Sequence, residues 1–199
     1  MTQNDWSTSL AAAIAEQVRR LRKERGMSAQ QLADACTDLG LPITRSAVAN
    51  LESQRRPTVS VAELLIFARA LDTPPILLLI PLGQQETVKL APEVTAATWD
   101  AVQWFAGLGP TSGETAVRLF LRHDRFVREY TFSARKAASA HAMHEGTADE
   151  NLRAAHAATA QAADRAATIA EEIITEVRDD IRSRGLTPPP LPPELAHLA

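Results

Sequence analysis

Apolar residues recur every three or four positions along most of the chain, the spacing that places side chains on one face of an α-helix. In the first run the apolar positions are Leu10, Ile14, Val18 and Leu21. Gly26 follows this run, and glycine is well suited to the left-handed conformation that ends many helices. The pattern therefore predicts a first helix that ends at about Arg25.

Capping signals predict where the next helices begin. Ser28 is followed three residues later by Gln31, which is the spacing of a capping box that satisfies unpaired backbone N–H groups. Ser60 and Glu63 have the same spacing. Between these two signals, Thr44 can cap a helix of its own. We therefore expect three short helices after the first.

The helix that begins at Thr44 is predicted to have two different faces. Val48 and Leu51 lie on its inward face. Its outward residues are polar: Arg45, Ser46 and Asn50. A short helix that follows a turn and presents polar side chains outward is typical of a module that binds DNA.

The pattern is less regular after the fourth helix. Thr73 before Pro74 predicts a fifth short helix, because proline suits a first helical turn. Residues 86–90 alternate like a short strand, and residues 98–106 have the pattern of a short helix with aromatic side chains. We expect those aromatic residues to be core rather than a ligand cage. Residues 83–111 are thus predicted to be a connector.

Two long helical patterns follow. The first ends at Gly146, and Thr147 with Glu150 predicts a capping box that starts the second, which ends at Gly185. Each is about 50 Å long at 1.5 Å per residue. A short turn between two such helices predicts an antiparallel hairpin over residues 112–185. The proline-rich residues 186–199 are expected to be an extended or disordered tail.

Composition supports a helical protein. The chain has 199 residues, of which 45% are apolar and 5% aromatic, and alanine supplies much of the apolar share. Cys36 is the only cysteine, so no intramolecular disulfide forms. The first ten residues lack a signal-peptide pattern, and the strongly apolar run at residues 76–80 is too short to span a bilayer. We expect an all-α, cytoplasmic protein without a membrane segment.

Charge is unevenly distributed. The net charge is −3, which argues against a general polyanion binder. The segment from Arg19 to Arg56, however, contains eight basic and only four acidic residues. This asymmetry favours a basic DNA-reading segment on an acidic body, although residues 19–25 alone are also explained as a solvated helix face.

Other candidate chemistry is weak. Ser133 and Lys136 have the S-x-x-K spacing of acylating serine enzymes, but the companion motifs are absent and the segment is predicted to be exposed helix. His141, His144 and His156 lie near the predicted hairpin turn, where no cysteine joins them. We expect no catalytic residues, no metal site and no cofactor.

The segments MSAQQLADAC, from Met27, and ITRSAVANLESQRRPTVSVAELLIFARALDTPPILLL, from Ile43, resemble the Cro/CI (Xre) helix-turn-helix repressors. Three lysines against eighteen arginines add a hint of an actinobacterial source. The resemblance covers about residues 13–82. It implies a five-helix, lambda-repressor-like DNA-binding domain over residues 1–82, ahead of the connector and the hairpin.

The resemblance also implies which side chains contact DNA. The helix that begins at Thr44 enters the major groove, where its outward residues reach base edges. Arg can bond guanine bidentately and Asn can bond adenine, whereas basic residues beyond the helix touch phosphates. The implied residues are Thr44 (backbone), Arg45, Ser46 and Asn50 (bases), and Arg55 and Arg56 (phosphates). Mere exposure is the alternative explanation for Arg45.

Other positions either match or depart from the family. The resemblance implies an internal ion pair between Arg22 and Glu52. Ala29 stands where the family usually has a polar residue, so that DNA contact is expected to be missing. The segment from Leu32 to Thr44 is about five residues longer than usual, which predicts an extra turn of helix before Gly40.

These observations predict a transcriptional regulator, a repressor that binds double-stranded DNA at a palindromic operator as a homodimer. The hairpin would form the dimer through its large apolar residues: Phe120, Val127, Tyr130, Ile169, Ile173 and Val177. The alternative is an antitoxin-like or adaptor protein whose hairpin captures a protein partner. A protein or small-molecule effector at the C-terminal half is left open.

Overall fold

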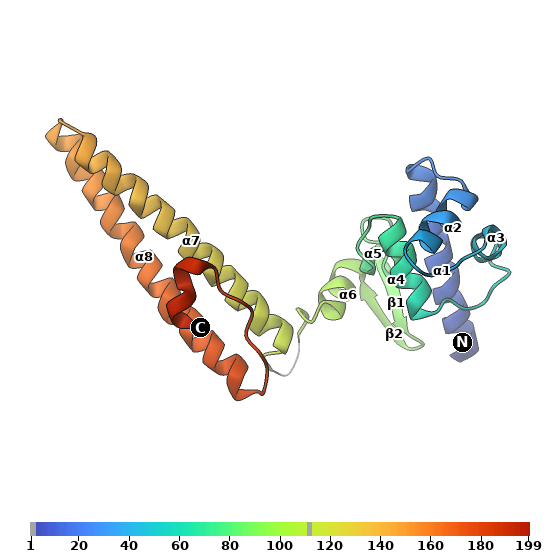
Figure 1. Cartoon of the computed structure of the whole chain (residues 1–199). Coiled ribbons are helices and arrows are strands. Elements are labelled where there is room, and N and C mark those ends of the chain that lie inside the picture. Colours follow the sequence, from blue (N-terminus) through green and yellow to red (C-terminus); the bar gives the residue numbers. More distant parts are fainter. Residues whose placement is uncertain (1–2, 111–112) are drawn as a thin grey trace. The chain divides into compact units, whose positions relative to one another are not determined.

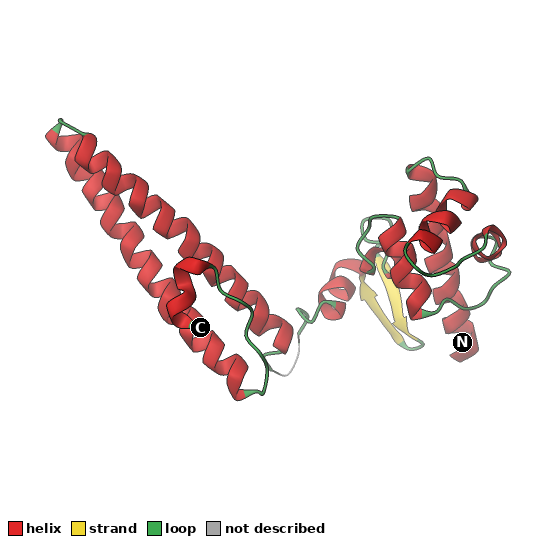
Figure 2. Cartoon of the chain, viewed as in Figure 1, coloured by secondary structure: helices red, strands yellow, loops and turns green. Residues whose placement is uncertain are grey.

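The computed structural model describes residues 3–110 and 113–199 (Figure 1). It divides into two compact units, Met1–Gly109 and Pro110–Ala199. Helices dominate both units (Figure 2), which confirms the predicted helical fold with an N-terminal helix-turn-helix domain and a long C-terminal helical pair. None of the helices in the described residues is both long enough and apolar enough to cross a membrane.

The first unit contains the five predicted helices. They are α1 (Gln3–Glu24), α2 (Ala29–Asp38), α3 (Arg45–Glu52), α4 (Val61–Ala70) and α5 (Ile76–Leu79). Their apolar faces meet in one core, whose best buried large side chains are Leu32, Val48, Leu51, Phe67, Leu71 and Leu78. Each such side chain contributes about 1.5–3 kcal/mol on burial. This core fixes α3 on its inner side.

The predicted side-chain caps of α2, α3 and α4 are confirmed, whereas α5 begins after Pro75 without a side-chain cap. Ser28 Oγ accepts the N–H of Gln31 at 3.2 Å, and the Gln31 side chain accepts the N–H of Ser28 at 2.8 Å. Ser60 and Glu63 form the same capping box at the start of α4. The segment between Leu32 and Thr44 is longer than usual for the family, and the predicted extra helical turn forms there. Helix α2 continues to Asp38, and Gly40 follows with φ +94°.

A β-hairpin and a sixth helix complete the first unit. Strand β1 (Thr87–Ala91) pairs antiparallel with β2 (Val94–Ala97), and α6 (Thr98–Phe105) follows. The sequence pattern had indicated β1 and α6 but not β2, which is short and half alanine, a weak strand former. Trp6 Nε1 donates to the carbonyl of Lys89 at 3.2 Å, which joins α1 to β1. The aromatic side chains Trp99, Trp104 and Phe105 of α6 are exposed rather than core.

The second unit is an antiparallel pair of helices, α7 (Ala116–Gly146) and α8 (Glu150–Ser183). Alanines fill most of the seam, whereas Leu119, Val177 and Ile181 form a cluster of larger apolar side chains near one end. The predicted capping box of Thr147 and Glu150 is wrong. Asp149 caps α8 by accepting two backbone N–H groups, because the Thr147 hydroxyl instead donates to the Met143 carbonyl of α7.

The proline-rich tail differs from the expected disordered segment. Residues Pro193–Leu198 form a 3₁₀ helix, η1, which lies against α8 (Figure 1). Leu195 is fully buried, and the carbonyl of Pro189 accepts a hydrogen bond from Arg178 at 2.9 Å. One apolar side chain and one buried donor therefore anchor a segment whose prolines already restrict its conformations.

Candidate nucleic-acid interface

The N-terminal part of α3 presents a polar surface on a rigid frame. Val48 and Leu51 are 0% and 1% exposed, so the inner side of α3 is fixed in the core. The structure brings the predicted outward residues together on the opposite side, where all are exposed: Thr44, Arg45, Ser46 and Asn50. The helix is only eight residues long, so this group occupies much of its outer surface.

Thr44 begins α3 and lies beside Ser46. The Thr44 hydroxyl accepts the N–H of Ala47 at 3.1 Å, and its oxygen lies 2.9 Å from the hydroxyl oxygen of Ser46. The first turn of a helix carries a partial positive charge, which favours negatively charged groups. This geometry suits an approach by a DNA phosphate close to the residues that would contact bases.

The turn after α3 separates the two predicted phosphate-binding arginines. Gln54 has φ +58°, and the N–H of Arg55 bonds to the carbonyl of Asn50 at 3.0 Å, which ends the helix sharply. Arg55 is exposed. Arg56 instead donates two hydrogen bonds to the Glu63 carboxylate, at 2.5 and 2.8 Å. No local sequence pattern indicated this difference between the two arginines.

Glu63 has two partners that explain its ionisation. Partial burial alone would raise the pKa of Glu63, but hydrogen bonds from Arg56 and Ser60 outweigh it and hold the pKa below its ordinary value. The carboxylate therefore holds the start of α4 and the arginine after α3 together. Arg56 would therefore contact DNA either with its ion pair to Glu63 intact or after that ion pair has broken.

Arg22 and Glu52 form the internal ion pair that the resemblance implied. Their two hydrogen bonds are both 2.6 Å long, and Arg22 also donates to the carbonyl of Met27 at 2.6 Å. The hydrogen bond to Glu52 raises the pKa of Arg22 despite the opposing effect of burial. The pair links α1 to the end of α3 and so helps to fix the orientation of α3.

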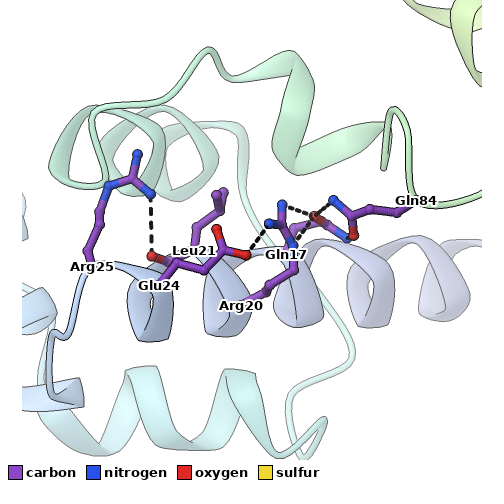
Figure 3. A network of polar contacts seen from close by, with 6 residues as sticks. All are labelled: Gln17, Arg20, Leu21, Glu24, Arg25 and Gln84. Atoms are coloured by element: carbon purple, nitrogen blue, oxygen red, sulfur yellow. Dashed lines mark hydrogen bonds and ion pairs between the residues drawn. The ribbon is translucent and has the colours of Figure 1, made fainter.

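A second polar network joins basic residues of α1 to the segment between α5 and β1 (Figure 3). Gln17, which is buried, exchanges amide hydrogen bonds of 3.2 and 3.3 Å with Gln84. Arg20 donates to Gln17 and forms an ion pair with Glu24. Arg25 donates to backbone carbonyls of Leu21 and Asp72. Arg20 and Arg25 therefore make contacts within the domain that the sequence pattern did not indicate.

The candidate chemical groups of the hairpin are dispersed. His141 Nε2 lies 2.9 Å from the Asp164 carboxylate, and His144 Nδ1 lies 3.0 Å from the carbonyl of Arg153. Within the described residues, no three His, Cys, Asp or Glu side chains are grouped as metal ligands. Ser133, predicted to be exposed, is buried in α7, whereas Lys136 is exposed.

The fold of the first unit and its exposed third helix define a helix-turn-helix DNA-binding domain. Residues 13–79, about a third of the chain, match the family model of a helix-turn-helix domain. Neither a search of curated proteins nor a search of solved structures found a match. The evidence for DNA binding therefore comes from the first unit alone.

Proposed function

We propose that this chain is a sequence-specific transcriptional regulator, a repressor of the Cro/CI (Xre) type that acts on DNA in the cytoplasm. The exposed polar face of α3, held by a buried inner face, is the observation that carries the proposal. Arg45 would donate two hydrogen bonds to a guanine, and Asn50 would bond an adenine. Arg55 would contact a phosphate and so position the domain without selecting a sequence.

The proposal includes a homodimer formed by the second unit. Alanine supplies much of the seam between α7 and α8, so two helices alone form a thin core. Several large apolar residues remain accessible: Ile169 is 55% exposed, and Phe126 and Ile173 are partly exposed. Phe126 and Ile169 line the same groove between the helices. A second hairpin laid in this groove would bury them in a four-helix arrangement.

The predicted dimer seam needs one correction. Val177 is 1% exposed and packs with Leu119 and Ile181 inside the hairpin, so it cannot contact a second chain. The other members of the predicted seam remain at least partly accessible: Phe120, Val127, Tyr130, Ile169 and Ile173. Within the hairpin Ile174 is fully buried, whereas its neighbour Ile173 is partly exposed and therefore available to a second chain.

Selection of bound sites from a random duplex library tests the proposed function. The full chain is expected to enrich an inverted repeat whose half-sites lie about one helical turn, or about 10 base pairs, apart. The matched control carries both Arg45→Ala and Asn50→Ala, which leave the core untouched and should abolish the enrichment. Failure of the intact chain to enrich any sequence would overturn the proposal.

A second candidate function is an antitoxin-like or adaptor protein whose hairpin captures another protein. The exposed apolar side chains near the hairpin turn, Met143 at 53% and Leu152 at 54%, favour it. Purification of the chain by itself separates the two candidates. A stable homodimer that binds DNA supports the repressor, whereas an aggregating chain that a co-expressed partner rescues supports the adaptor.

A further inference from the structure

An apolar groove of about 610 Å³ lies in the second unit, between the first turns of α7 and the proline-rich tail. Its walls are mostly hydrocarbon and come from Val117, Phe120, Leu121 and Val127 of α7 and from Pro189 and Pro190. This volume lies within the range of small-molecule sites, about 300–1,000 Å³. His123 and Asp124 supply the polar part of the lining.

A buried positive charge lies directly behind this lining. Arg178 of α8 is 6% exposed, and none of the ion pairs found among the described residues includes it. One of its terminal nitrogens donates to His123 Nε2 at 3.3 Å and to the Pro189 carbonyl at 2.9 Å. Its Nε is buried without any hydrogen-bond partner. Burial of a guanidinium without a neighbouring anion costs free energy of folding, and an anion close to it reduces that cost.

The groove and the charge share residues. Both acceptors of Arg178, His123 and Pro189, line the groove. Because a guanidinium only donates, His123 Nε2 must accept, and the imidazole is therefore neutral with its proton on Nδ1. Asp124 is the acidic residue of the lining, and its carboxylate lies 2.8 Å from Arg128. Arg178 does not itself line the groove, but only His123 and Pro189 separate its positive charge from that end, so a negative group is favoured there by electrostatic attraction.

We propose that this groove binds a small amphipathic carboxylic acid. The apolar body of the ligand lies along Val117, Leu121 and the prolines, and its carboxylate lies at the His123 and Pro189 end. There the carboxylate compensates the positive charge of Arg178 through space, across His123 and Pro189. The binding step requires no DNA, and only the role of such a ligand as an effector rests on the proposed function.

Calorimetric titration of the full chain with decanoate and with decanol, both below micellar concentrations, tests the site. The two probes have the same number of carbons, and the alkyl chain of decanol is one methylene longer, so an advantage of decanoate must come from its charged head group. Decanoate is expected to bind once per chain and about tenfold or more tightly than decanol, because only the carboxylate is attracted by the positive charge of Arg178 behind the lining. Equal affinities would overturn the proposal.

Two variants locate the probe. Arg178→Met removes the buried charge but keeps much of the volume, and it should bring decanoate affinity down to that of decanol. Arg182→Met, one turn further on and 43% exposed, is the matched control and should behave as the unmodified chain. Retention of the preference for decanoate in Arg178→Met would contradict the assigned charge.

Ala116→Phe keeps the test decisive if Arg178→Met fails to fold. Ala116 is exposed and lines the groove, so a larger side chain should fill the groove without disturbing the helical seam. Both probes should then lose most of their affinity, and unchanged binding would exclude the groove. These titrations report on the second unit alone, so their failure and a failure to select DNA sites are distinguishable.

Discussion

Arg22 of α1 and Glu52 at the end of α3 are joined by two hydrogen bonds of 2.6 Å, and their side chains are only 11% and 10% exposed. Breaking a buried pair leaves the remaining charge without compensation, which costs about 3–5 kcal/mol. We therefore expect Glu52→Gln to lower the melting temperature of the first unit. Tryptophan fluorescence measures it, because all three tryptophans lie in that unit.

The pair between Arg20 and Glu24 provides the matched control. It has the same 2.6 Å distance, but its side chains are 32% and 53% exposed. An exposed pair contributes under about 1 kcal/mol, so Glu24→Gln should shift the melting temperature little. Equal shifts of the melting temperature for Glu52→Gln and Glu24→Gln would mean that the internal pair stabilises the domain no more than an exposed pair does.

Arg45 and Asn50 are predicted to select the DNA sequence. Arg45→Ala or Asn50→Ala should cost about 1–3 kcal/mol on the preferred site while leaving non-specific binding nearly unchanged. The physical reason is that each side chain can form two hydrogen bonds to one base edge. Fluorescence anisotropy with the selected site and with a scrambled duplex measures both affinities. An Arg45→Ala variant that keeps its full preference would contradict the assignment.

The neighbours Arg55 and Arg56 should respond differently to salt. Arg55 is exposed, so Arg55→Ala should weaken binding to all duplexes and reduce the salt dependence by about one unit of slope. Arg56 is paired with Glu63, and Arg56→Ala should change the slope less while destabilising the start of α4. Binding measured over a range of salt concentrations tests this. Equal slopes for the two variants would place both arginines on phosphates.

Local signals made much of the first unit predictable. Ser28, Thr44 and Ser60 cap their helices as expected, because a cap depends only on residues within one turn. The polar face of α3 could be predicted for the same reason. The pair of Arg22 with Glu52 spans thirty positions, and only the family resemblance indicated it.

Other features depend on contacts that no local pattern encodes. Asp149 rather than Thr147 caps α8, since the hydroxyl of Thr147 finds a closer acceptor in the preceding helix. The tail is ordered because Leu195 meets the hairpin, a contact between distant segments. In the alanine-rich helix α8, the sequence pattern placed Ile173 and not Ile174 on the apolar face, whereas Ile174 is the fully buried residue. The rotation of such a helix follows from packing of its few large residues.

The dimer proposal predicts that a charge in the groove between α7 and α8 separates the chains. Ile169 is 55% exposed within one chain, so Ile169→Asp should leave the hairpin folded but bury an unpaired charge in the dimer. Sedimentation is expected to show monomers. Leu152→Asp, at 54% exposure near the hairpin turn, is the control for a general effect of charge and should remain dimeric. A dimer that persists in Ile169→Asp would exclude this interface.

His123 predicts a pH dependence of the second unit. The side chain is 2% exposed, and its pKa lies below the ordinary 6.5, first because of burial and then because of Arg178, with Asp124 opposing. The folded state therefore holds His123 neutral at a pH where the unfolded chain binds a proton. The contribution of neutral His123 to the free energy of unfolding is present in full above about pH 6.5 and is lost as the pH falls below that value. The loss is about 1.4 kcal/mol for each unit by which the folded and unfolded pKa values of His123 differ.

Hydrogen exchange in α7 and α8 at pH 7.5 and 5.5, with rates corrected for pH, measures this loss. His123→Gln is expected to flatten the dependence, because an amide oxygen can still accept from Arg178 and does not titrate. His156→Gln changes a histidine elsewhere on α8 and should retain the dependence of the unmodified chain. If His123→Gln lost as much protection at pH 5.5 as the unmodified chain, the titrating group would lie elsewhere, and the neutral His123 acceptor would have no part in the acid response.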